Sequence, residues 1–141
     1  MMTNAIINNA KRVAKSLIYR DYVSCFWSNC DNWGDALTPY LVARISGRPV
    51  RFDENPYCWK YFVIGSVLQR ADKYSIVWGS GMISPEALPA QAPHRVHAVR
   101  GPLTRKMLMQ SGIKCPDVYG DPALLLPRYF NPPKSGTYRL G

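Results

Sequence analysis

Two carboxylates and an amide lie close together in the segment DNWGD, Asp31 to Asp35, where a turn leads into a helical pattern. An Asp beside a cleft can act as a general base or hold a substrate hydroxyl, and Gly34 would let a ligand approach the backbone closely. Helix capping by Asn32 or Asp35 is the alternative, because free amides at a helix N-terminus stabilise an acceptor side chain. A cap needs only one such side chain, so Asp35 is our candidate acid–base group.

A single arginine, Arg100, stands at the start of the segment RGPLT, directly before a second helical pattern. A guanidinium can hold a carboxylate or phosphate through two parallel hydrogen bonds, and the amides of a helix N-terminus would assist it. A structural salt bridge from Arg100 to Asp35 or Asp121 is the alternative. Pro102 fits the first turn of the helix, and Thr104 could cap it.

Short runs rich in aromatic and β-branched residues alternate with helical patterns along the chain. Strands are expected within residues 22–27, 49–52, 61–65, 74–81 and 95–101. Helices are expected at 35–46, with Pro39 in the first turn and Gly47 closing it, and at 102–111, closed by Gly112; residues 66–71 fit a helical turn or two. This order predicts an α/β fold with a Rossmann-like, open, mostly parallel sheet covered by helices on both faces.

A glycine with a polar or charged neighbour follows nearly every expected strand. Ligands of open α/β sheets bind beyond the carboxyl ends of the strands, so these residues are predicted to line one cleft. Besides Asp35 and Arg100, the predicted substrate-binding positions are Asn32, Gly34, Gly65, Ser66, Gly79, Ser80, Gly81, Thr104 and Asp121. The glycines do not form the phosphate-loop or dinucleotide fingerprints, which argues against ATP hydrolysis and nicotinamide dinucleotide binding.

The chain of 141 residues has a formal net charge of +9, which favours an anionic partner for a single domain of this size. The basic residues are dispersed and no nucleic-acid recognition motif occurs, so no nucleic-acid partner is expected. The cysteine spacing fits no zinc site, and neither a metal nor a cofactor is predicted. Free thiols and the absence of a secretory signal pattern point to the cytoplasm. Trp33, Trp59 and Trp78 could stack on a sugar, with core packing as the default.

Residues 1–20 form a basic amphipathic helical pattern, with Ile6, Val13 and Leu17 on one face and Lys11 and Lys15 elsewhere. Docking on the chain's own domain is favoured over contact with an anionic membrane surface. Residues 21–126 form the predicted lobe. From 127 to 141 a proline-rich linker leads to what would be the first strand of a second lobe.

Five segments in series carry a resemblance to a known family: NWGDALTPYLV, IGSVL, VWGSGM, VRGPLTRKML and GIKCPDVYGDPALLLP. Together they resemble the polysaccharide pyruvyl transferases. The resemblance implies two Rossmann-like lobes facing a cleft, as in a glycosyltransferase-like (GT-B-like) fold. It also implies transfer of pyruvate from phosphoenolpyruvate to a glycan or lipid-linked saccharide as a cyclic ketal, in exopolysaccharide or cell-surface glycan synthesis at the inner face of the membrane.

Within that resemblance, Asp35 and Arg100 occupy the positions most like the family's active-site residues. Members of the family are much longer, and their second lobe supplies a further donor-binding Arg or His. The chain therefore resembles a first lobe, which we expect to be inactive by itself. Two alternatives remain open: a lobe of a sugar-nucleotide glycosyltransferase, and a basic domain that binds polyanions or a membrane surface.

Overall fold

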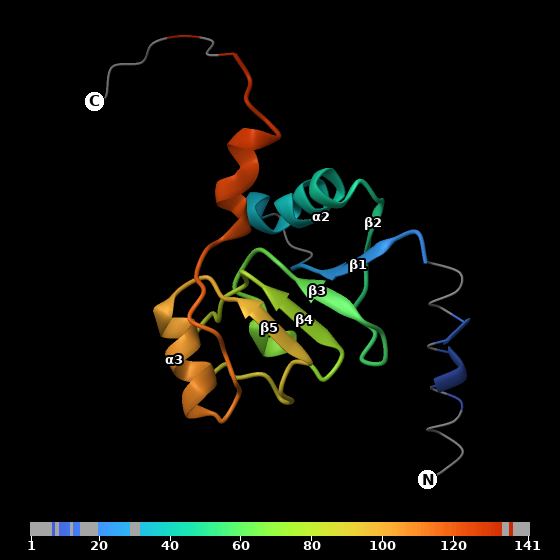
Figure 1. The fold of residues 1–141 in the computed structure, drawn as a ribbon, viewed down its shortest axis with the longest axis vertical. Helices are drawn as coiled ribbons and strands as arrows, with labels where there is room; N and C mark the ends of the chain where they lie inside the picture. Colours follow the sequence, from blue (N-terminus) through green and yellow to red (C-terminus); the bar gives the residue numbers. More distant parts are fainter. Residues whose placement is uncertain are drawn as a thin grey trace.

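From residue 20 onward, the described residues form five short strands, two α-helices and two 3-10 helices in a computed structural model (Figure 1). The structure describes residues 7, 9–11, 13–14, 20–28, 32–133 and 136. In chain order the elements are β1 Val23–Phe26, α2 Trp33–Ser46, β2 Val50–Phe52, β3 Lys60–Phe62, η1 Leu68–Arg70, β4 Ser75–Trp78, β5 Arg95–Ala98, α3 Pro102–Gln110 and η2 Pro122–Arg128. All five expected strands are present, each shorter than its sequence pattern.

The strands form one sheet in the order β2-β1-β3-β4-β5, and every pairing between them is parallel. The registers place Val23 beside Val50, Cys25 beside Tyr61 and Phe62 beside Val77. The direction in which strands are added to the sheet reverses between β1 and β3. β2 lies on one side of β1, and β3, β4 and β5 follow in turn on the other side. In open α/β sheets such a reversal leaves a crevice beyond the carboxyl ends of the two strands. The predicted α/β class with a parallel sheet is confirmed.

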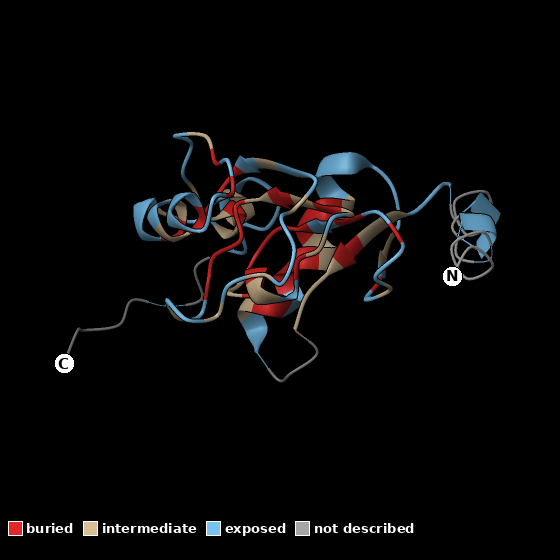
Figure 2. Ribbon diagram, turned by 90° about the horizontal axis from the view of Figure 1, so that it is seen from below, coloured by how far each residue is buried: buried red, intermediate tan, exposed pale blue. Residues whose placement is uncertain are grey.

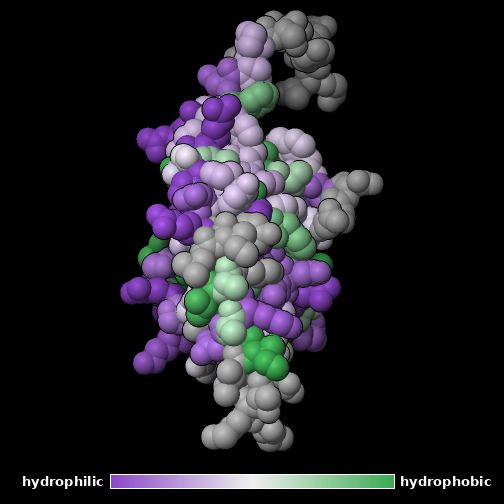
Figure 3. Space-filling model, turned by 90° about the vertical axis from the view of Figure 1, so that its right-hand side faces the viewer, coloured by the Kyte–Doolittle hydropathy of each residue, from purple (hydrophilic) through white to green (hydrophobic). Residues whose placement is uncertain are grey.

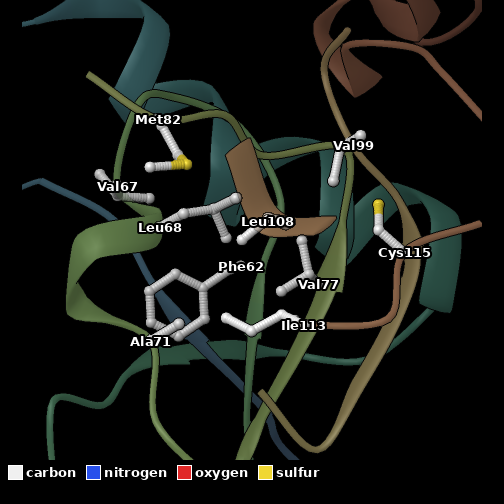
Figure 4. Close-up of a cluster of buried hydrophobic side chains, with 10 residues drawn as sticks. All are labelled: Phe62, Val67, Leu68, Ala71, Val77, Met82, Val99, Leu108, Ile113 and Cys115. Atoms are coloured by element: carbon white, nitrogen blue, oxygen red, sulfur yellow. The ribbon is translucent and has the colours of Figure 1, made fainter. Parts of the chain in front are cut away.

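Successive side chains of each strand point to opposite faces of the sheet, and apolar side chains lie on both faces. Phe62 and Val77 pack on one face with Leu68 of η1 and Leu108 of α3, in the cluster drawn in Figure 4. On the other face, Cys25 packs with side chains of α2, chiefly Leu37, Leu41 and Val42, and η2 contributes Ala123 and Leu126. Figure 2 shows the buried residues concentrated between these layers. Helical segments thus cover both faces, as predicted.

Helix α2 begins at Trp33, because Asn32 and not Asp35 is its N-cap: the Asn32 side chain accepts a hydrogen bond from the Gly34 amide at 2.9 Å. The expectation that Pro39 lies in the first turn is therefore wrong, and this proline lies inside the helix. The C-terminal end is as predicted. Gly47 adopts φ 65° and donates its amide to the Ala43 carbonyl.

The helix expected after 101 is also present, but its cap differs from the prediction. Pro102 is in the first turn as expected, whereas the N-cap is Gly101, which makes no side-chain capping hydrogen bond. Thr104 lies within the first turn and is buried, so it cannot be the cap. The connection from 79 to 94 contains no helix, and its prolines at 85, 89 and 93 remove the amide donors that a helix would need.

The two predicted end segments are described only in part. Most of residues 1–20 lies outside the described residues, and so does most of the predicted start of a second lobe after 133. Helix η2 continues through Pro127 and Arg128 into the predicted linker, and the Tyr40 hydroxyl donates to the Tyr129 carbonyl at 3.1 Å. Among the described residues, no helix has the length and apolarity required to span a bilayer. The face in Figure 3 is mainly hydrophilic, with hydrophobic residues in separate patches.

Candidate functional site

The carboxyl ends of β1, β3, β4 and β5 bring most of the predicted substrate-binding residues to one edge of the sheet. We call this set the rim site, consisting of Asn32, Gly34, Asp35, Gly65, Ser66, Gly79, Ser80, Gly81, Arg100, Thr104 and Asp121. It lies along the edge of the sheet at which open α/β proteins place their ligands. The loops of the rim site are joined to one another by hydrogen bonds.

Asp35 lies in the first turn of α2 and is 7% exposed. Its carboxylate packs directly over the backbone that follows β3: a methyl group added at Gly65 would come 2.3 Å from Oδ1 of Asp35. Gly65 has φ +94°, a conformation that also favours glycine. Both facts require glycine at this position. The Asp35 carboxylate therefore lies between the N-terminus of α2 and the end of β3, where the helix dipole stabilises its negative charge.

The loops that follow β3 and β4 are joined through one carbonyl. The Gly65 carbonyl accepts hydrogen bonds from the Gly81 amide and from the Ser80 hydroxyl, both at 2.9 Å. The Gly81 carbonyl in turn accepts from the Leu68 amide at 3.1 Å. Ser80 is fully buried, so its hydroxyl serves the fold and is not presented to the crevice. The two loops therefore form one rigid support.

Arg100 lies on that support with its guanidinium exposed at the crevice. Its Nη1 donates to the Ser66 hydroxyl at 2.8 Å, its Nη2 to the Met82 carbonyl at 3.4 Å, and its backbone amide to the Ser80 carbonyl at 3.2 Å. The guanidinium lies against Gly81, where an added methyl group would come 2.7 Å from Nε. Glycine at position 81 thus makes room for the arginine head.

The cation of Arg100 is held by neutral groups alone. No ion pair joins it to a carboxylate within residues 20–28 and 32–133, so the predicted alternative of a salt bridge to Asp35 or Asp121 is not found there. Helix α3 starts directly after Arg100, and its N-terminus lacks a side-chain cap. A fixed guanidinium beside uncapped helix amides is an arrangement that binds compact anions.

Asp121 is used differently from the prediction that it binds substrate. It caps η2, accepting a hydrogen bond from the Ala123 amide at 3.0 Å. The same corner is packed against Gly79, which has φ +98° and where a methyl group would come 2.2 Å from Cδ of Pro122. Asp121 thus anchors η2 beside the rim site, and capping accounts for its carboxylate. Asn32 also has a capping role, so capping explains one part of the DNWGD segment and leaves Asp35 for another.

Two features of the rim site were not anticipated from the sequence. The Met82 carbonyl orients Arg100, and no sequence pattern marks a backbone carbonyl as a partner. Trp33, for which core packing was the default, is 69% exposed directly beside the Asp35 turn.

Three buried cysteines lie among the residues that the structure describes. Cys25, Cys58 and Cys115 form no disulfide, and burial raises the pKa of the Cys25 thiol to about 12. Burial also raises the pKa of Cys115, with smaller effects from Arg105 and Asp117. In the part of the chain that the structure describes, no three His, Cys, Asp or Glu side chains are grouped so as to hold a metal ion.

Comparison with protein-family models, with curated proteins and with solved structures finds no match to this chain. Interpretation of the rim site consequently rests on its own geometry and on the order of its sequence motifs.

Proposed function

We propose that this chain is the first lobe of a pyruvyl transferase that moves pyruvate from phosphoenolpyruvate to a sugar as a cyclic ketal. The observation that carries the proposal is the exposed guanidinium of Arg100, which Ser66 and Met82 hold without a carboxylate partner among the described residues, at the edge of the sheet that also holds Asp35. The five motifs in series support the same assignment.

Phosphoenolpyruvate suits this arrangement because it is compact and strongly anionic. We assign its phosphate or carboxylate to the Arg100 guanidinium and the uncapped N-terminus of α3. Protonation of the enol methylene makes the adjacent carbon electrophilic, a sugar hydroxyl attacks that carbon and loses its proton, and inorganic phosphate leaves. A second hydroxyl then attacks the oxocarbenium carbon that the departing phosphate leaves behind and gives its proton to that phosphate, which closes the ketal. Asp35 is our candidate for the group that exchanges protons with the acceptor hydroxyl.

The complete reaction is proposed to need a second lobe across the crevice, which would supply further donor contacts. The proposed acceptor is a glycan or lipid-linked saccharide of a cell-surface or exopolysaccharide pathway, and the proposed setting is the cytoplasm, at the inner face of the membrane. The described lobe alone is expected to bind phosphoenolpyruvate and to show little or no transfer.

Thermal unfolding with and without millimolar phosphoenolpyruvate tests the proposal. A ligand at 100 times its Kd stabilises the folded chain by about 2.7 kcal/mol, which shifts the midpoint by several degrees. The shift should disappear in Arg100→Ala and persist in Arg95→Ala, which removes the same charge from the opposite end of β5. If both variants lose the midpoint shift equally, or if inorganic phosphate shifts the midpoint as much as phosphoenolpyruvate does, the binding is unspecific attraction by the net positive charge.

A glycine pair gives a second test that leaves every charge in place. In Gly81→Ala the new methyl group displaces the Arg100 head, while in Gly101→Ala the methyl group meets no atom within 4 Å. Phosphoenolpyruvate should protect the second variant and not the first. Protection by uridine diphosphate glucose in place of phosphoenolpyruvate would instead assign the lobe to a sugar-nucleotide glycosyltransferase.

A further inference from the structure

A groove of about 460 Å³ opens on the face of the sheet that α2 covers. Val23, Val63 and Trp78 contribute to it from three neighbouring strand regions, and Val42 and Ile45 contribute from α2. Its volume lies within the range of sites for small organic ligands, and such sites are lined mainly by apolar and aromatic side chains. The groove shares no lining residue with the rim site, so it does not depend on the proposed transferase activity.

Aromatic side chains of the groove are exposed although aliphatic residues beside them are buried. Trp59 is 42% exposed and Tyr61 39%, whereas Val63 is 1% exposed. Trp59 is held in place by edge contacts with the rings of Tyr74 and His94, with ring centroids 5.4 and 4.5 Å apart. A fixed, exposed indole next to an apolar groove offers a surface for a flat or extended apolar body.

Three arginines, Arg20, Arg48 and Arg51, also line the groove. Arg48 is anchored by backbone carbonyls: its Nε donates to that of Asp21 at 3.2 Å, and its Nη2 donates to those of Tyr22 at 3.3 Å and Arg20. These acceptors are neutral, so its positive charge is not cancelled by a carboxylate in the described part of the chain. Arg51 is paired with Asp53 and contributes less net charge.

From this combination we infer a second ligand site, which takes a soluble amphipathic organic anion. The apolar body packs against Trp59, Trp78 and Val63, and a phosphate, sulfonate or carboxylate head lies at Arg48. A neutral apolar ligand would make no use of the positive charge of Arg48, and an amphipathic cation would be repelled by that charge. A groove of this volume holds one small molecule, so binding should be one to one.

Fluorescence titration of the full chain with 8-anilinonaphthalene-1-sulfonate, an aromatic sulfonate, tests the inference. We expect one saturable site, displacement of the dye by decyl phosphate, and no displacement by decyltrimethylammonium or phosphoenolpyruvate. Equal displacement by the anionic and the cationic amphiphile would overturn the role of the arginines. Displacement by phosphoenolpyruvate would place the dye at the rim site. Stronger competition from phosphatidylglycerol vesicles than from decyl phosphate at equal phosphate would assign the groove to a membrane surface.

Filling the groove provides the matched variants. Ile45→Trp on α2 should weaken dye binding by about tenfold or more, while Leu103→Trp on the exposed face of α3 should leave it unchanged. Arg20→Glu reverses an exposed charge at the groove, 4.0 Å from Asp21, and should weaken binding about threefold to tenfold, against no change in Arg70→Glu on η1. Binding that is unaffected by both groove variants contradicts the site.

The chain's own N-terminal segment is the competing occupant, because its apolar residues precede Arg20 in sequence. Replacing Leu17 and Ile18 by Asp should leave dye affinity within about threefold of the original. An increase of about tenfold or more would show that this segment normally fills the groove, and would overturn the proposal of a separate ligand.

Discussion

The two ends of the parallel sheet hold their cations in opposite ways. At the amino end of β3, Lys60 is buried and its Nζ donates to Oδ2 of Asp72 at 2.6 Å and to the Asn55 carbonyl at 3.1 Å. At the carboxyl end of β5, Arg100 is exposed and bonds only to neutral oxygens of Ser66 and Met82 within the described residues. One cation is fully neutralised by the fold, and the other retains its charge for a ligand.

The partners of the two cations show the same difference. Asp72 accepts hydrogen bonds from the Tyr74 amide and the Ser75 hydroxyl as well as from Lys60, so the buried charge lies in a complete network. Ser66 and Met82 orient Arg100 but supply no negative charge. In our proposal, the amino end of the sheet serves stability and the carboxyl end serves binding. The predictions below test that division.

Asp72→Ala should have the largest effect on stability. It leaves the Lys60 ammonium buried without its counter-ion, which costs about 3 to 5 kcal/mol of unfolding free energy. Urea unfolding measures the loss, with Glu86→Ala as a control that removes an exposed carboxylate. The double variant Lys60→Met, Asp72→Ala should recover a large part of the loss. A cost in Asp72→Ala no greater than in Glu86→Ala would mean that the pair does not stabilise the fold.

Gly79→Ala should come next, because it damages the packing that supports the carboxyl end. The alanine would have to adopt φ +98° and its methyl group would meet Pro122 and the Gly120 carbonyl. We expect a loss of about 3 kcal/mol, measured by urea unfolding beside Gly101→Ala, whose methyl group meets no atom and which should lose only about 1 kcal/mol because alanine is a poorer N-cap. Gly81→Ala should resemble the control in stability and differ from it only in ligand binding. A large loss of unfolding free energy in Gly81→Ala would show that the loop after β4 is needed both for stability and for ligand binding.

Cys25, buried in β1 between the two ends of the sheet, must stay uncharged in the folded chain. Burial raises its pKa from 9.0 to about 12, so its contribution to stability is complete below pH 9.0 and is lost as the pH rises through about 12. Over that window the chain should lose about 1.4 kcal/mol per pH unit more than Cys25→Ala does, as measured by urea unfolding. If the unfolding free energies of the original chain and of Cys25→Ala fall equally with pH, the Cys25 thiol does not lose its proton on unfolding.

Ser66→Ala should have the smallest effect, and only on binding. Loss of the hydrogen bond to Nη1 of Arg100 frees the guanidinium and should weaken phosphoenolpyruvate binding about threefold to tenfold, near 1 kcal/mol. The unfolding free energy should stay within about 0.5 kcal/mol of the original. Calorimetric titration gives the affinity, with Ser84→Ala in the neighbouring loop as the control. An unchanged affinity would remove Ser66 from the site.

The elements of the sheet could be predicted because local patterns specify them. Aromatic and β-branched runs marked all five strands, and Gly47 and Gly112 marked the ends of α2 and α3. The start of α2 was misplaced because Asn32 and Asp35 are both good caps, and only the hydrogen bond to the Gly34 amide distinguishes them. The parallel arrangement of the strands also followed from the α/β pattern, whereas their order in the sheet did not.

The internal bonding of the rim site could not be predicted, since it depends on contacts between loops far apart in sequence. Nothing in the pattern shows that Ser80 is turned inward to the Gly65 carbonyl, or that Asp121 caps η2. The groove beside α2 was equally hidden. It arises because α2 and η2 leave Trp59 and Tyr61 exposed, and the extent of that cover is set by tertiary packing.

The shared acceptor at the Gly65 carbonyl has a consequence for how the crevice can open. Because it bonds to both the Gly81 amide and the Ser80 hydroxyl, the loop after β4 cannot separate from the loop after β3 without breaking both bonds at once. Amide hydrogen exchange in the two loops should therefore be correlated, with Gly81 and Leu68 exchanging through one common opening event. A ligand that reaches Arg100 would slow exchange at both amides, although it touches only one loop.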